Sequence, residues 1–162
     1  RNSACAWVES YRGPVKPKPP GQQEDEFDIY INDVGWDWLE FPALVKKMRE
    51  LSGPHYVEAK SSGKSAVQAL STYGIKAVEV TVLGDKLARA AAVQPAIANG
   101  RIWVRAQVTR KLLWGERQGL LRITAEGLQT GGEGLDLNDA FVQAVTRHLG
   151  IGAEPERKLR FR

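Results

Sequence analysis

Apolar and polar positions alternate near the start of the chain as they do in half-buried β-strands. Residues 4–11 and 27–34 both show this period of two, and a loop rich in Gly and Pro separates them. Proline lacks the amide hydrogen that helices and central strands need, so residues 16–20 continue neither. We therefore expect the two segments to pair as an antiparallel hairpin across this loop.

Helical spacing begins at Phe41 and then alternates with short β-branched segments. Apolar residues recur three to four positions apart up to Leu51, again from Val67 to Tyr73, and a third time after Asp85, which can cap a helix that ends at Asn99-Gly100. Between and after these helices we expect strands at residues 55–58, 75–82 and 102–104. Strand, helix and strand in succession predict a parallel crossover, and hence an α/β fold with a mixed β-sheet flanked by helices.

The pattern is weaker between Gln107 and Gln129. Residues 118–123 can return as a strand after residues 114–117, which predicts a basic hairpin. A last helix follows a Gly-rich loop, with Asp136 or Asn138 as its cap and an apolar face up to Leu149. We expect residues 154–162 to be frayed.

Composition places the chain among ordinary globular domains. It has 162 residues, 43% of them hydrophobic, which is enough for one domain with a core. The formal net charge of +4 is a modest indication of a polyanionic partner. Cys5 is the single cysteine and fits a reducing compartment, and no apolar run has the length of a membrane span, so we expect a soluble intracellular protein. Because the first residue is Arg1 and a strand pattern follows at once, we interpret residues 1–162 as a single domain excised from a longer chain.

Two acidic positions far apart in the sequence are the best candidates for chemistry. Glu58 ends an expected strand directly before a Gly turn, a position where open α/β sheets place reactive groups. Asp136 and Asp139 begin the last helix. Carboxylate oxygens are the ligands of hard cations such as Mg²⁺ or Mn²⁺. The alternatives are a solvated glutamate and aspartates that only cap the helix.

Other sites are weaker. Gly63-Lys64-Ser65 lacks the remainder of a P-loop, because Glu58 stands where that motif requires glycine. His55, His148 and Cys5 are too few for a zinc site of usual ligand count, and no serine has the context of a nucleophile elbow.

Basic residues form two candidate surfaces for a phosphate backbone. Lys86 and Arg89 are three apart on one face at a helix start. The second is the expected hairpin, where basic residues are interleaved with Trp103 and Trp114; they are Arg105, Arg110, Lys111, Arg117 and Arg122. A solvated amphipathic helix and tryptophans in the core are the alternatives. The candidate DNA-binding residues are Lys60, Lys64, Lys86, Arg89, Arg110, Lys111 and Arg117.

Several of these segments together resemble the C-terminal nuclease domain of large terminase subunits, which package DNA into the capsids of tailed bacteriophages. The similarity comprises the Glu-x-Lys-x-Ser-Gly turn at residues 58–63, Gly84-Asp85-Lys86-Leu87-Ala88-Arg89-Ala90, Gln94-Pro95, the turn at 99–101, and the acidic turn and helix from Asp136 to Leu149. The chain departs from the family pattern at Ala59 and Leu135, where an acid is usual, and the aspartate of the family's first strand has no counterpart.

The resemblance implies a ribonuclease H-like mixed β-sheet flanked by helices and a metal-dependent endonuclease that cleaves double-stranded viral DNA. Glu58, Asp136 and Asp139 would be catalytic ligands of Mg²⁺ or Mn²⁺, and Lys60, Lys86 and Arg89 would hold phosphates. It further implies a missing strand before residues 1–3, an N-terminal ATPase motor, a portal protein and small terminase subunit as partners, and a location at the procapsid in the host cytoplasm. The alternative is a non-catalytic DNA-binding or protein-docking domain of the packaging motor.

Overall fold

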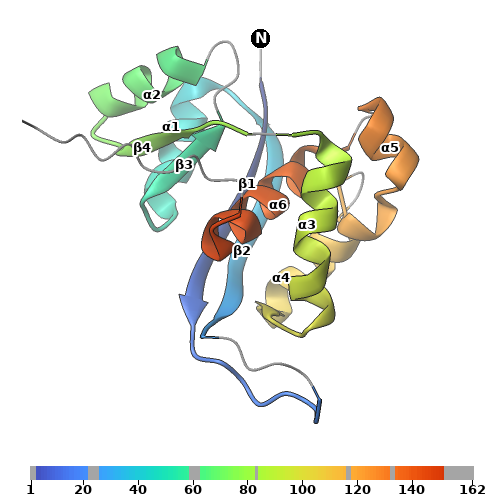
Figure 1. Cartoon of the computed structure of the whole chain (residues 1–162). Coiled ribbons are helices and arrows are strands. Elements are labelled where there is room, and N and C mark those ends of the chain that lie inside the picture. Colours follow the sequence, from blue (N-terminus) through green and yellow to red (C-terminus); the bar gives the residue numbers. More distant parts are fainter. Residues whose placement is uncertain are drawn as a thin grey trace, which may run out of the picture.

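A computed structural model of the chain describes residues 3–21, 26–58, 63–82, 84–115, 118–131 and 134–151. Within these ranges the chain has a mixed α/β fold in which helices flank short sheets (Figure 1). The strands are β1 (Ser3–Gly13), β2 (Asp28–Leu39), β3 (His55–Glu58), β4 (Ala77–Val80) and β5 (Ile102–Val104). The helices are α1 (Phe41–Glu50), α2 (Gly63–Thr72), α3 (Lys86–Ala98), α4 (Ala106–Trp114), the 3₁₀ turn η1 (Leu120–Arg122), α5 (Ala125–Thr130) and α6 (Asp136–Leu149). None of these helices is long and apolar enough to cross a membrane.

The expected antiparallel hairpin is confirmed, and it is longer than the sequence pattern indicated. β1 and β2 pair from Ser3–Leu39 to Gly13–Asp28. The register shifts in the middle, because Glu9 pairs with Asp33 but Ser10 pairs with Ile31, so Asn32 is an extra residue on β2. Such a bulge bends the strand and keeps apolar residues on the same face along its whole length.

The strands form two sheets and not the single mixed sheet that we expected. β5 pairs in parallel with the Ile29–Ile31 segment of β2, which gives a three-stranded mixed sheet in the order β1-β2-β5. β3 and β4 pair in parallel as a separate two-stranded sheet, and the helix α2 between them confirms the expected crossover. Figure 1 shows the small sheet and α2 on one side of the long hairpin, with α3, α4 and α5 on the other.

Each sheet has its own apolar core. The larger core joins one face of β1 and β2 to α3, α4 and α6, and its most buried residues include Ile29, Val34 and Val145. The smaller core joins α1, α2 and the small sheet through Val45, Met48, Leu70 and Ile75.

The basic hairpin expected between Gln107 and Gln129 is wrong. Residues 106–114 form α4 because Val108 and Leu112, four positions apart, both turn toward the larger core. Residues 120–122 form a 3₁₀ turn where we expected a strand, and Thr124 then caps α5 by accepting a hydrogen bond from the Gly127 amide at 3.0 Å.

The expected cap of α6 is also wrong. The cap position is Leu135, and neither Asp136 nor Asn138 caps the helix with its side chain. The buried side chain of Gln118 takes this role, since its Oε1 accepts a hydrogen bond from the Leu137 amide at 3.1 Å. The carboxylate of Asp136 is therefore available for other contacts.

Candidate functional site

Glu58 lies at the end of β3, where it contacts α6. Its carboxylate accepts a hydrogen bond from Gln143 Nε2 at 3.0 Å. Two residues earlier on the same strand face, the ring of Tyr56 lies beneath the guanidinium of Arg147, whose Cζ is 3.3 Å from the ring centroid. These two contacts hold the small sheet against α6.

Asp136, Asp139 and Gln143 lie on one face of α6. Their spacings of three, four and seven residues correspond to successive turns of the helix. By the rise of an α-helix, Gln143 is about 6 Å along the axis from Asp139 and about 10 Å from Asp136. Glu58 therefore lies beside the acidic face of α6, and Asp139 is the nearer of the two aspartates along the helix.

Both aspartates of α6 have donors from other elements. Asp139 pairs with Lys86 at the start of α3, with Nζ and Oδ2 2.8 Å apart and side chains that are 35% and 17% exposed for Lys86 and Asp139. Asp136 accepts a long hydrogen bond of 3.4 Å from Trp36 Nε1 on β2. Each candidate carboxylate thus already has one protein donor, and only Lys86 among these donors is charged.

The donor chemistry of this face suits a hard cation, because the three groups offer carboxylate oxygens. Their positions, however, do not bring three ligands to one ion. Among the residues that the structure describes, no three side chains of Asp, Glu, His or Cys are grouped as ligands of one metal ion. Glu58, Asp136 and Asp139 therefore do not form a complete metal site by themselves.

The expected DNA-binding residues are dispersed. Besides Lys86, which is paired with Asp139, Arg89 donates to the Gly84 carbonyl at 2.5 Å. Arg110 and Lys111 are exposed residues of α4. Lys60, Arg117 and the side chain of Lys64 lie outside the described residues.

Gln143 and Trp36, which bind two of the candidate carboxylates, were not among the residues predicted from the sequence. The position of Gln143, seven residues after Asp136, is the signal that could have identified it, since this spacing returns to the same helix face. Trp36 carries no comparable signal, because its contact with Asp136 joins residues 100 positions apart. Beside it, Trp38 lies edge-on to Trp36 at 6.0 Å and is 55% exposed.

Asp28 is a carboxylate that the sequence pattern did not single out. It is fully buried on β2. It pairs with Lys18 at 2.8 Å, and it accepts hydrogen bonds from the Lys16 amide at 3.0 Å and from Trp103 Nε1 at 2.8 Å. Burial alone would raise the pKa of Asp28, but these donors outweigh it and hold the pKa below its usual value. Asp28 therefore anchors the Pro-rich loop to the sheet.

His148 of α6 is half-buried against β1. Its Nε2 is 2.8 Å from Ser10 Oγ, and its carbonyl accepts from Arg12. Burial, and then the positive charge of Arg12, lowers the pKa of His148. In the described part of the chain no carboxylate bonds this ring, so the pair lacks the acid of a Ser-His-Asp arrangement.

No protein-family model matches the chain, and no curated protein matches it significantly.

Proposed function

We propose that the chain carries part of the carboxylate site of a metal-dependent DNA endonuclease of the ribonuclease H-like type, acting on double-stranded viral DNA during packaging. In this proposal Glu58, Asp136 and Asp139 bind Mg²⁺ or Mn²⁺. The proposal extends the terminase resemblance to a host-cytoplasmic packaging motor with an ATPase, a portal protein and a small subunit.

The observation that supports it is the hydrogen bond between Gln143 and Glu58. It joins the strand-end glutamate to the helix face of Asp136 and Asp139, although these segments are about half the chain apart in sequence. Acidic residues that meet at the end of a strand are characteristic of sites that hold divalent cations.

The proposal requires at least one further carboxylate, since the three described here are not grouped tightly enough for one ion. The arrangement of the two sheets suggests where a strand carrying this further carboxylate would lie. Among the described strands β1 pairs only with β2 and β3 only with β4, and both β1 and β3 contact α6. A strand added between β1 and β3 would join the sheets and place its side chains beside Glu58.

A second candidate is a DNA-binding module without catalysis. The ion pair between Lys86 and Asp139 favours it, because a lysine already neutralises one of the proposed ligands. In this case the acidic residues would orient the basic ones and would bind no metal.

Cleavage of plasmid DNA by the natural full-length protein separates the two candidates. Glu58→Gln and Asp136→Asn remove a charge at nearly constant shape, and we expect each to reduce Mn²⁺-dependent cleavage by at least about 100-fold, the scale of a group that stabilises the transition state directly, while thermal unfolding is unchanged. Glu79→Gln is the matched control, because Glu79 is exposed on the neighbouring strand β4. Cleavage at the control rate in both site variants would show that these carboxylates are not ligands.

A further inference from the structure

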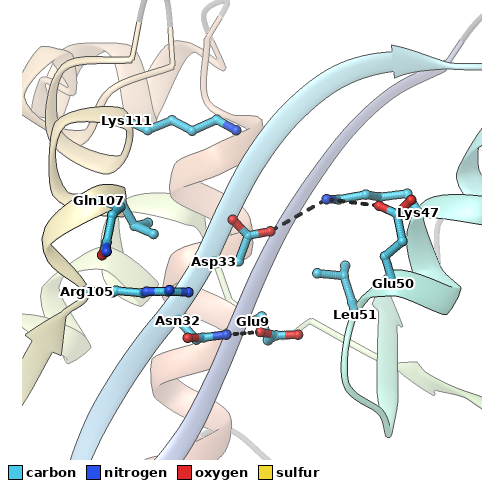
Figure 2. A pocket seen from close by; sticks show the side chains of 10 residues that line it. Glu9, Asn32, Asp33, Lys47, Glu50, Leu51, Arg105, Gln107 and Lys111 are labelled. Carbon is cyan, nitrogen blue, oxygen red and sulfur yellow. Dashed lines mark hydrogen bonds and ion pairs between the residues drawn. The ribbon is translucent and has the colours of Figure 1, made fainter.

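A polar groove of about 470 Å³ crosses the outer face of the long hairpin (Figure 2). This face lies opposite α6, because Ser10 and Arg12 point toward His148 and the intervening residues of β1 point the other way. Figure 2 shows side chains of α1 and α4 reaching toward each other across the strands. The residues lining this α1–α4 groove are Glu9, Asn32, Asp33, Lys47, Glu50, Leu51, Arg105, Gln107, Val108 and Lys111.

The acids of the groove are occupied by donors from the protein. Glu9 accepts a hydrogen bond from the Ser52 amide at 2.7 Å. Asp33 and Glu50 each lie 3.7 Å from the ammonium group of Lys47. Lys47 is shared by two carboxylates and, among the described residues, Glu9 is bonded only by neutral amides, so the floor and the α1 wall keep a net negative charge.

The α4 wall is different, because its two cations have no acidic partner within the part of the chain that the structure describes. Neither Arg105 nor Lys111 forms an ion pair with any residue in the described ranges. Both are exposed, and both point into the groove in Figure 2. This wall offers positive charge to a ligand.

Trp7 lies between the two walls. A Cβ on Gly35 would come within 1.9 Å of its ring, so one face of the indole rests on β2. The ammonium groups of Lys47 and Lys111 lie 5.0 and 5.7 Å from the ring centroid. Cations from opposite walls thus converge over one aromatic ring. The carboxylate of Asp33 accepts a hydrogen bond from Trp7 Nε1 at 3.3 Å and occupies the Lys47 side of this ring. Lys111 approaches from the other wall.

The same face continues along the strands as an aromatic surface. Tyr11, four residues after Trp7 and hence about 13 Å away, is 53% exposed and stacks on Tyr30 with centroids 5.3 Å apart. Beside them, Lys16 lies 4.4 Å from the ring centroid of Trp103. The exposed part of Tyr11 can contact a further planar group.

We propose that this face binds single-stranded nucleic acid, with phosphates at Arg105 and Lys111 and a base stacked on Tyr11. Aromatic rings beside positively charged side chains are a common means of holding single strands without sequence preference. In this groove the α4 wall supplies those side chains, with Arg105 and Lys111. A base inside a duplex is already stacked on both sides and cannot use the open ring. The surface would add a second nucleic-acid contact to the proposed nuclease, on the face away from Glu58, and it does not depend on cleavage.

Fluorescence anisotropy with a labelled oligothymidylate tests the proposal, in chelator so that metal ligands play no part. We expect the double variant Arg105→Ala, Lys111→Ala to bind at least about 10-fold more weakly and to flatten the plot of log affinity against log salt by about 1.4, since each phosphate contact on a single strand contributes about 0.7. Tyr11→Ala should weaken binding roughly 5- to 150-fold, the range that one base–aromatic stack supplies, and Tyr11→Phe should retain affinity.

Lys46→Ala with Lys76→Ala is the matched control, because it removes the same charge from exposed positions outside the groove. Equal affinity and salt slope in the groove and control variants would overturn the phosphate assignment. Tighter binding of a duplex than of the single strand, together with no effect of Tyr11→Ala, would overturn the assignment to single strands. Circular dichroism of each variant checks that the hairpin is folded.

Discussion

At the scale of single residues, the described polar side chains gain their partners mainly across long sequence separations. Asp28 bonds Trp103, Glu58 bonds Gln143, and Ser10 bonds His148. Such contacts leave no periodic signal in the sequence, because either partner alone is an ordinary polar or aromatic residue. Asp28 has the largest expected effect on stability, since a buried charge without its partner is strongly unfavourable.

We expect Asp28→Asn to lower the free energy of unfolding by about 3–5 kcal/mol, because the substitution leaves the buried ammonium of Lys18 without its counter-charge. The folded state holds the pKa of Asp28 below its usual value. The contribution is therefore fully present above the unfolded pKa of about 3.9 and is lost as the pH falls through the lower folded value. Urea unfolding at about pH 7 and about pH 3, on either side of that unfolded value, should show a smaller difference between variant and wild type at the acid pH.

Asp37→Asn is the control for this experiment, since Asp37 is an exposed aspartate on the same strand. Its substitution should change the free energy of unfolding by less than about 0.5 kcal/mol. If Asp28→Asn matched this control at neutral pH, the buried ion pair would contribute nothing to stability.

At the scale of the elements, α6 organises the candidate site. Its inner face packs in the larger core, its first turn is capped by Gln118, and Glu58, Lys86 and Trp36 all contact side chains along it. Lys86 is the first residue of α3. Asp85 caps that helix, as the sequence predicted, because its side chain accepts a hydrogen bond from the Ala88 amide at 2.7 Å. The Lys86–Asp139 pair therefore fixes α3 relative to α6.

Lys86→Ala with Arg89→Ala should weaken duplex DNA binding about equally for unrelated sequences, because phosphate contacts carry no base information. The slope of log affinity against log salt concentration should become shallower by up to about 1.8, or about 0.9 for each phosphate that the variant no longer neutralises. Lys86 must leave Asp139 to reach a phosphate, and a partly exposed pair of this kind contributes about 1 kcal/mol or less. Asp139→Asn, measured without divalent metal, should therefore strengthen binding, whereas weaker binding would contradict a phosphate contact by Lys86.

Most elements could be predicted from the sequence, and the failures have identifiable causes. The hairpin, α1, α3 and the crossover through α2 follow from clear periodicity with Gly and Pro at their ends. Residues 106–123 were misassigned because exposed tryptophan and basic residues hide the two apolar positions, Val108 and Leu112, that face the core. The candidate acids were evident from their positions, but Gln143, Trp36 and the groove on the opposite face depend on tertiary contacts.

At the scale of the whole molecule, α6 covers one face of the hairpin with Asp136 and Asp139 beside Glu58 of β3, and the opposite face of the hairpin carries the α1–α4 groove. The hairpin β1–β2 contributes to both, through Trp36 on the α6 side and through Trp7 on the groove side. Neighbouring strand positions therefore serve different surfaces, which is what alternation along a strand produces. Substitutions on the two faces should consequently affect cleavage and single-strand binding independently.

The division of the interior into two cores also sets how the protein opens. Among the residues that the structure describes, four are buried in the smaller core and eleven in the larger one. Segments with less buried apolar surface exchange their amide hydrogens through partial unfolding that costs less free energy. Native-state hydrogen exchange should show α1, α2, β3 and β4 exchanging together, before α6 and β2. Glu58 belongs to this less protected unit and Asp136 to the more protected one, so each partial unfolding event would take the candidate site apart while the groove floor stays folded.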